Sequence, residues 1–361
     1  MKKIFFIAGL FMLASCETLL LPDPTGPERQ ISLQARLMTT DTLHTVYAAY
    51  SEHDSLEQAE DLTIACYVNG ECVAVTSESV VGEKEYYSDK EAQWRAYTFR
   101  ADIHPGDSVR IEATSPTERA TASVKAPDAV PVPEVSMDVI PSEDGKSYLD
   151  RLRFRIHVED QPGKRNWYRL STSMRRVVNE RRPAGIVYPY YGWTGDDSWH
   201  CVYDKTEDIS MSNATDVFLN PDGRTVDRWT KDYLANEYNF FTDELIEDGA
   251  VDLTLETSAY SICHLLLSSY SACTYHGSFY VYFDLQNLSR EDYLNSRMQE
   301  MKYLSLTDVE FVDGLFSEDL VLPDNVKGGI GLITVRSVSR VVFMLGEKYN
   351  EGQADFGWPL D

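Results

Sequence analysis

The stretch that decides the fold of the first half of the chain is LTIACYVNGECVAVT, residues 62–76. It holds two runs of β-prone residues on either side of Asn69-Gly70, a dipeptide that favours a two-residue hairpin turn. The register set by this turn places Cys66 opposite Val73. Because side chains alternate between the faces of a strand, Cys66 and Cys72 lie on opposite faces. A disulfide between these two cysteines is therefore disfavoured despite their short spacing.

Similar short runs continue on both sides of this hairpin. Residues 31–37 alternate apolar and polar side chains, and the later runs are divided by turn signals such as Pro105-Gly106-Asp107. This pattern is typical of an immunoglobulin-like β-sandwich, which we predict over residues 30–127. The expected strands are 31–37, 44–50, 62–68, 72–76, 94–99, 109–114 and 120–125.

A stiff link of Pro127, Pro131 and Pro133 ends this first domain. We predict a second β-rich domain over residues 134–345, with one or two short helices, and a loosely ordered tail over 346–361. The best helix is 289–300, because Ser289 can cap it and acidic residues follow in its first turn. The expected strands are 152–158, 167–173, 251–256, 260–267, 278–285, 309–311, 330–335 and 340–345. The fold class is therefore mainly β.

The N-terminal residues have the features of a bacterial lipoprotein signal. Lys2 and Lys3 precede a short apolar run, and Leu13-Ala14-Ser15-Cys16 matches the lipobox. We therefore expect residues 1–15 to be a signal peptide, Cys16 to carry lipid, and residues 16–29 to be a proline-rich tether. No later segment is apolar for long enough to cross a bilayer, so we expect attachment to the membrane through this lipid alone.

The charge of the chain is strongly negative. Its formal net charge is −25 at pH 7, from 58 acidic and 33 basic residues. Phosphate backbones would repel such a surface, so we expect no nucleic-acid partner. The negative charge is typical of a soluble body, and it also leaves open attraction of cationic or metal-bearing cargo.

The cysteines after Cys16 leave two alternatives open. A disulfide among Cys201, Cys263 and Cys273 is one alternative, because an exported chain meets an oxidising environment. A zinc site is the other, since histidines adjoin or lie near these cysteines, at His200, His264 and His276. The spacings match no zinc signature, and neighbouring residues on a strand point to opposite faces. We therefore predict structural cysteines or one disulfide, and neither a metal site nor a cofactor.

Catalytic motifs are absent from the sequence. It contains no nucleophile elbow, zinc-protease helix, phosphate-binding loop or dinucleotide fingerprint, and we predict no catalytic residues. One stretch is unusual because aromatic and acidic residues gather between a proline and a glycine. Such a loop offers stacking faces and hydrogen-bond acceptors, which suit a ligand or a protein partner, although the same rings can also fill a core. The candidate contact residues are Tyr188, Tyr190, Tyr191, Trp193, Asp196, Asp197 and Trp199.

The C-terminal part resembles a known family. Phe316-Ser317-Glu318-Asp319-Leu320 and the segment from Pro323 to Gly331 are similar to the closing motif of the domain-of-unknown-function 4249 lipoproteins. Phe241-Thr242-Asp243-Glu244 and Tyr280-Val281-Tyr282 are also similar to that family, as is the order of lipobox, tether and two β-rich domains. The resemblance implies an envelope lipoprotein of Bacteroidota-like bacteria, often encoded beside a TonB-dependent outer-membrane receptor. It implies no activity and no catalytic residues.

Two functions of different class follow from these observations. The first is an outer-membrane lipoprotein that acts as a non-catalytic accessory or ligand-binding module with a TonB-dependent receptor in nutrient uptake. The second is an envelope hydrolase or metal-binding enzyme. Surface lipoproteins of such bacteria usually carry acidic residues just after the cysteine, whereas here Glu17 is followed by Thr18-Leu19-Leu20-Leu21. The choice between the cell surface and the periplasmic face therefore stays open.

Overall fold

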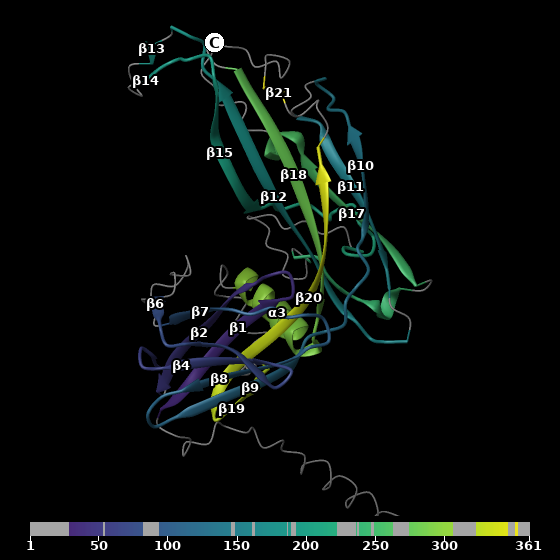
Figure 1. Cartoon of the computed structure of the whole chain (residues 1–361). Helices are drawn as coiled ribbons and strands as arrows, with labels where there is room; N and C mark the ends of the chain where they lie inside the picture. Colours follow the sequence, from purple (N-terminus) through teal and green to yellow (C-terminus); the bar gives the residue numbers. More distant parts are fainter. Residues whose placement is uncertain are drawn as a thin grey trace, which may run out of the picture.

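A computed structural model describes most of the chain as two β units placed end to end (Figure 1). The structure describes residues 29–52, 55–81, 94–145, 149–160, 163–185, 187–188, 193–221, 236, 238–246, 249–262, 274–305, 323–345 and 351–352. The mainly β fold class is confirmed. None of the helices in this described part is long and apolar enough to cross a membrane.

The first unit is a sandwich of two sheets, as predicted. One sheet holds β1 (Gln30–Met38), β2 (Leu43–Glu52), β3 (Ser55–Gln58), β6 (Ser79–Val81) and β7 (Arg95–Arg100). The other has the order β19-β9-β8-β4-β5, with β4 (Thr63–Val68), β5 (Glu71–Thr76), β8 (Ser108–Thr114), β9 (Arg119–Lys125) and β19 (Val326–Lys327). Alternate residues of these strands point inward and form one apolar core, which includes Leu33, Tyr97, Ile64 and Ile111.

The second unit is also built from two facing sheets. A three-stranded sheet has the order β10-β11-β17, from β10 (Glu134–Ile140), β11 (Arg151–Glu159) and β17 (Ala250–Ser258). It faces the longer strands β12 (Trp167–Arg181), β15 (Trp199–Asp208), β18 (Thr274–Leu288) and β20 (Gly329–Met344). The core between them includes Phe154, Tyr168 and Phe283. Short elements complete the unit: β16 (Phe240–Thr242), the 3-10 turn η2 (Asp243–Leu245) and β21 (Glu351–Gly352).

The strand β20 belongs to both units. Its first half pairs in parallel with β1, from Ile31 opposite Gly329 to Met38 opposite Arg336. Its second half pairs antiparallel with β18, from Ser337 opposite Asn287 to Met344 opposite Tyr280. The region expected as a second domain, 134–345, therefore gives its segment 326–336 to the first sandwich, where Val326, Ile333 and Val335 lie in the core.

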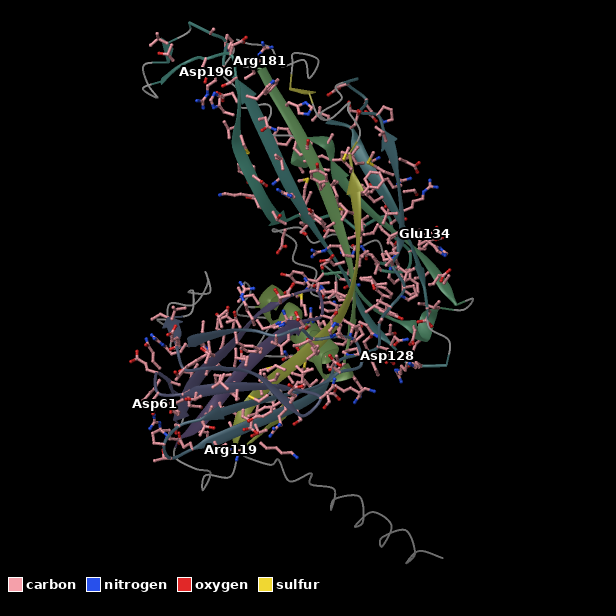
Figure 2. All side chains as sticks on the ribbon, viewed as in Figure 1. Asp61, Arg119, Asp128, Glu134, Arg181 and Asp196 are labelled. Carbon is pink, nitrogen blue, oxygen red and sulfur yellow. The ribbon has the colours of Figure 1, made fainter. Side chains whose placement is uncertain are left out.

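The proline link is fastened to this shared strand. The hydroxyl of Ser337 donates a hydrogen bond to the carbonyl of Pro127, and that of Ser339 donates to the carbonyl of Val130. The side chain of Asn287 also donates to the carbonyl of Asp128, at 3.1 Å. Figure 2 labels Asp128 where the two units meet. The link is therefore held in place by β18 and β20 as well as stiffened by its prolines.

The glycines that open β20 are required by its close approach to β1. A Cβ atom at Gly329 would collide with the carbonyl oxygen of Ile31, and one at Gly331 with that of Leu33. Gly331 also has a φ of 121°, which L side chains rarely adopt. Beside them, the Asn325 side chain accepts from Ile333 N at 3.0 Å and donates to Ile333 O at 2.7 Å. The segment that carries the family resemblance thus has a structural role here.

The helix α3 (Arg290–Ser305) lies at the corner between the units (Figure 1). Its start is as predicted, since Ser289 Oγ accepts a hydrogen bond from Asp292 N at 3.1 Å. The carboxylate of Asp292 points into the protein and binds Arg336, the last residue of β20 that pairs with β1. One ion pair therefore joins the helix to the strand at the point where that strand changes partner.

Some sequence expectations need correction. A bulge between Cys66 and Tyr67 places Cys66 opposite Ala74 instead of Val73, although Cys66 is buried and Cys72 exposed, as expected from opposite faces. The strand expected over 260–267 is wrong at its start, because residues 259–262 are helical. The expected strands 330–335 and 340–345 form one strand, β20. The strand expected over 309–311, and the tail apart from 351–352, lie outside the described residues.

Candidate functional site

The predicted contact residues lie at the end of the longest hairpin of the second unit. The arms of this hairpin are β12 and β15, which pair from Ser173 opposite Asp208 to Arg181 opposite Trp199. Between the arms, β13 (Val187–Tyr188) pairs with β14 (Trp193–Thr194). We call residues 181–200 the hairpin tip. Figures 1 and 2 show it at the end of the molecule opposite the first sandwich.

The base of the hairpin tip is fixed by backbone geometry and one ion pair. Asp197 has a φ of 61° and donates its N–H to the carbonyl of Arg182 at 2.8 Å. Its carboxylate accepts two hydrogen bonds from the Arg181 guanidinium, at 3.1 and 3.0 Å. A Cβ atom at Gly195 would collide with the carbonyl oxygen of Pro183. These contacts hold the loop against the ends of its two strands, so the tip is presented in a defined orientation.

Asp196, Ser198 and His200 form a compact polar cluster beside this ion pair. Asp196 Oδ1 accepts from Ser198 N at 3.1 Å, from Ser198 Oγ at 2.6 Å and from His200 Nε2 at 3.0 Å. His200 Nε2 also lies 2.8 Å from Ser198 Oγ. The hydrogen bonds from Ser198 and then from His200 hold the pKa of Asp196 well below its ordinary value.

This cluster lacks the geometry that activates a serine nucleophile. In a catalytic triad the aspartate binds one imidazole nitrogen and the serine donates its proton to the other. Here Asp196 and Ser198 share the same nitrogen, and the Ser198 hydroxyl donates to Asp196 instead of to His200. The Nε2 atom of His200 therefore carries a proton and donates it in the hydrogen bond to Asp196. The role of the cluster is to stabilise the turn between Asp196 and His200.

The tip exposes apolar side chains to solvent. Val187 is 64% exposed and Trp199 is 51% exposed. The Trp199 ring meets the edge of the His276 ring with a centroid distance of 6.4 Å, which leaves the rest of the indole uncovered. Exposed aromatic and branched side chains are suited to contact with another molecule.

The seven predicted contact residues do not all fall in the described part of the chain. The backbones of Tyr188 and Trp193 pair across the small sheet at the tip. The other three lie around its base. Asp196 accepts hydrogen bonds within the turn, Asp197 forms the ion pair with Arg181, and Trp199 is exposed. Tyr190 and Tyr191 lie outside the described residues.

The structure describes only some of the cysteines and histidines that a disulfide or a zinc site would use. Cys66, Cys72 and Cys201 are free, and Cys263, His264 and Cys273 lie outside the described residues. Within the described part, no three histidine, cysteine or acidic side chains gather closely enough to hold a metal ion.

Sequence reasoning missed a second set of polar residues, at the junction of the units. Arg336 is fully buried and is bound by Asp292, Gln286 and Ser296. These side chains come from two strands and a helix, so no local spacing connects them. In the sequence, the sign of this cluster is Arg336, a charged residue that directly follows the mainly apolar run 330–335.

Comparisons with known proteins complete the description. The family model described as "Domain of unknown function (DUF4249)" matches residues 60–340. No curated protein matches the chain. A crystal structure of a mutant Salmonella alpha-2-macroglobulin is 11% identical and has a TM-score of 0.21, with 73% of this chain and 14% of that chain covered. A glycosyl hydrolase family 2 member from Bacteroides cellulosilyticus is 9% identical and has a TM-score of 0.15, with 67% and 22% covered.

The chain thus spans about a seventh of the macroglobulin and less than a quarter of the hydrolase. Both TM-scores are too low to establish a shared fold.

Proposed function

Because this chain belongs to the DUF4249 family, we propose that it is a lipid-anchored outer-membrane protein that works as a non-catalytic docking or ligand-binding module. Its partner is a TonB-dependent receptor engaged in nutrient uptake. The proposed anchor is Cys16, in the lipobox Leu13-Ala14-Ser15-Cys16. The surface proposed to contact the partner is the hairpin tip.

The observation that carries this proposal is the separation of the tether from the tip. Arg29, where the proposed tether ends, lines a hollow with Arg119 and Gly328 at the outer end of the first sandwich. Figure 2 labels Arg119 at one end of the molecule and Arg181 and Asp196 at the other. A body anchored near Arg29 therefore presents the hairpin tip away from its own attachment point, which suits contact with a second molecule.

The character of the tip also supports docking over catalysis. Val187 and Trp199 are exposed there, whereas the polar side chains Asp196, Asp197 and Ser198 are engaged in contacts within the loop. Rigid exposed aromatic residues tend to supply much of the binding energy at protein interfaces. The Asp196–Ser198–His200 cluster offers no activated nucleophile to the alternative of a hydrolase.

Co-purification from solubilised envelopes tests the docking role. We expect a tagged full chain to recover a receptor barrel, and the double substitution Val187→Asp with Trp199→Ala to weaken the interaction by about 2 kcal/mol, or about thirtyfold in Kd. The matched control is Val80→Asp, because Val80 is 65% exposed but lies on β6 of the first sandwich. Recovery of no barrel with the wild-type chain, under conditions that preserve known receptor complexes, would contradict the docking role.

The anchor is tested separately. We expect Cys16→Ala to move the chain from the membrane fraction to the soluble fraction and to remove incorporation of labelled palmitate. Protease treatment of intact cells then reports whether the chain faces the exterior or the periplasm. A chain that stays in the membrane fraction with Cys16→Ala contradicts the lipid anchor but leaves the docking role to the co-purification experiment.

A further inference from the structure

Three arginines from three strands converge on one carboxylate at the junction of the two units. Arg36 lies on β1, Arg169 on β12 and Arg336 on β20, and all three interact electrostatically with Asp292 of α3. The chain as a whole has a net charge of −25, so an excess of positive charge at one buried place is unusual for it. The single carboxylate of Asp292 can neutralise only one of these three cations.

Asp292 is engaged almost entirely by Arg336. The Arg336 guanidinium donates from Nε to Asp292 Oδ2 at 2.6 Å and from Nη2 to Oδ1 at 2.8 Å. Its remaining contacts are with Gln286 Oε1 at 2.8 Å and Ser296 Oγ at 2.9 Å. Four of the five N–H donors of Arg336 are thus engaged, and its charge is matched by the single carboxylate.

Arg36 is left with weak contacts. Its Nε lies 3.9 Å from Asp292 Oδ1, and its Nη2 donates to Ser296 Oγ at 3.4 Å. Its side chain is 40% exposed. Burial, followed by repulsion from Arg336, lowers the pKa of Arg36 to about 10. The guanidinium therefore has donors to spare on a side that solvent can reach.

Among the described residues, no carboxylate forms an ion pair with the Arg169 guanidinium, although the charges of Asp208 and Asp292 act on it. Its Nε is buried and has no hydrogen-bond partner within the described part of the chain. The guanidinium lies 5.5 Å from the ring centroids of Tyr238 and Phe240. Burial and then the charge of Arg336 lower the pKa of Arg169. Tyr238 is 37% exposed, so this part of the junction also opens to solvent.

We propose that the junction is a binding site for an oxyanion group, a carboxylate or a phosphate, held between Arg36 and Arg169. A guanidinium presents planar paired donors that fit both groups, and a buried cation without a partner is costly. A bound oxyanion supplies the missing acceptor for Arg169 Nε and the missing charge for Arg36. Since Arg36 lies on β1 of the first unit and Arg169 on β12 of the second, the ligand would also tie the two units together. This site is distinct from the hairpin tip and does not depend on the docking role.

The test is thermal unfolding of the purified full chain in sodium phosphate, sodium acetate and sodium chloride at equal ionic strength. We expect phosphate or acetate to raise Tm in a saturable way that chloride does not. A rise with phosphate alone identifies a phosphate-bearing ligand, and a rise with acetate alone identifies a carboxylate-bearing one. Arg36→Gln and Arg169→Gln should each weaken the apparent Kd by about tenfold or more, since each removes charge-assisted hydrogen bonds.

The matched control is Arg175→Gln, because Arg175 lies on the same strand as Arg169 but is paired with Asp204 on the exposed surface. This variant should keep the full response. If Arg169→Gln does not fold, Arg36→Gln decides the matter, since it leaves the buried Arg336–Asp292 pair intact. The proposal is overturned if neither oxyanion stabilises the wild-type chain beyond chloride, or if Arg36→Gln responds as the wild type does.

Discussion

The guanidinium of Arg336 and the carboxylate of Asp292 form a two-point ion pair with both side chains almost completely withdrawn from solvent. Arg336 is the last residue of β20 that pairs with β1, and the next residue, Ser337, pairs with β18. Asp292 is anchored in turn by the start of α3, where its N–H donates to Ser289. The pair therefore fixes the place where one strand passes from the first unit to the second.

Removing one partner of this pair should destabilise the protein strongly. Arg336→Met or Asp292→Asn leaves the other charge buried without a counter-charge, which costs about 3–5 kcal/mol. Arg336→Met combined with Asp292→Asn should cost less than the sum of the single changes, because neither member of the pair is then left buried without its partner. Urea unfolding measures both effects. Additive single changes would show that the two residues act independently.

Arg340 and Asp284 provide the matched control for this prediction. Arg340 lies on the same strand as Arg336 and forms a similar two-point pair with Asp284 of β18, at 2.6 and 2.7 Å, but the Arg340 side chain is 44% exposed. Arg340→Met should cost less than Arg336→Met, because solvent reaches the Arg340 guanidinium and screens this pair. An equal loss at both positions would mean that burial is not what makes the Arg336 pair important.

The ion pair should also make the free energy of unfolding depend on pH in the acidic range. Burial alone would raise the pKa of Asp292, but the hydrogen bonds and charge of Arg336 outweigh burial and lower it. A lowered pKa in the folded state means that the contribution is complete above the ordinary value of about 3.9 and is lost as pH falls below it. The difference in unfolding free energy between wild type and Asp292→Asn should therefore be constant near pH 7 and shrink towards pH 3. A constant difference over that range would refute this assignment.

Replacing either glycine at the start of β20 by alanine should destabilise the protein. Gly329→Ala brings a Cβ against the carbonyl of Ile31 and should cost about 1–3 kcal/mol from steric crowding. Gly331→Ala should cost more, because its φ of 121° adds backbone strain of about 1–3 kcal/mol. Gly145→Ala is the control, since its φ is 67° but nothing lies within 4 Å of the added atom. Equal costs at Gly145 and Gly331 would show that the approach of β1 is not the constraint.

The free thiols should differ in reactivity. Burial raises the pKa of the Cys66 thiol to about 11, so little thiolate is present at neutral pH. Cys72 and Cys201 are exposed. Alkylation of the folded chain, followed by peptide mass spectrometry, should label Cys72 and Cys201 well before Cys66, and denaturation should remove the difference. Early labelling of Cys66 in the folded chain would contradict its place in the core.

Features set by neighbouring residues were predictable from the sequence. The Asn69-Gly70 turn and the Ser289 cap both depend on contacts within a few positions, and both are present. The bulge beside Cys66 was missed, because nothing in the local pattern distinguishes an extra residue from a regular pair. The hairpin tip was likewise predicted as a loop, but the pairing of Arg181 with Asp197 depends on the turn geometry that the fold imposes.

Features that join distant parts of the chain were not predictable. Ser337 and Ser339 interrupt the apolar pattern and suggest two strands, whereas their hydroxyls bind the carbonyls of the proline link. The pairing of β20 with β1 joins distant residues: Ala35 lies opposite Ile333, and the Thr334 hydroxyl donates a hydrogen bond to the Ala35 carbonyl, 299 positions away. No periodicity in a single sequence records such a partner, and the junction arginines depend on the same long-range arrangement.

The double role of β20 has a consequence for the order of events during synthesis. The strand β1 is synthesised long before β20, the neighbour that completes its sheet, because Ile31 of β1 pairs with Gly329 of β20. The first sandwich therefore lacks part of its core and one edge of β1 until residues 326–336 have been made, so it cannot reach its final form domain by domain behind the ribosome.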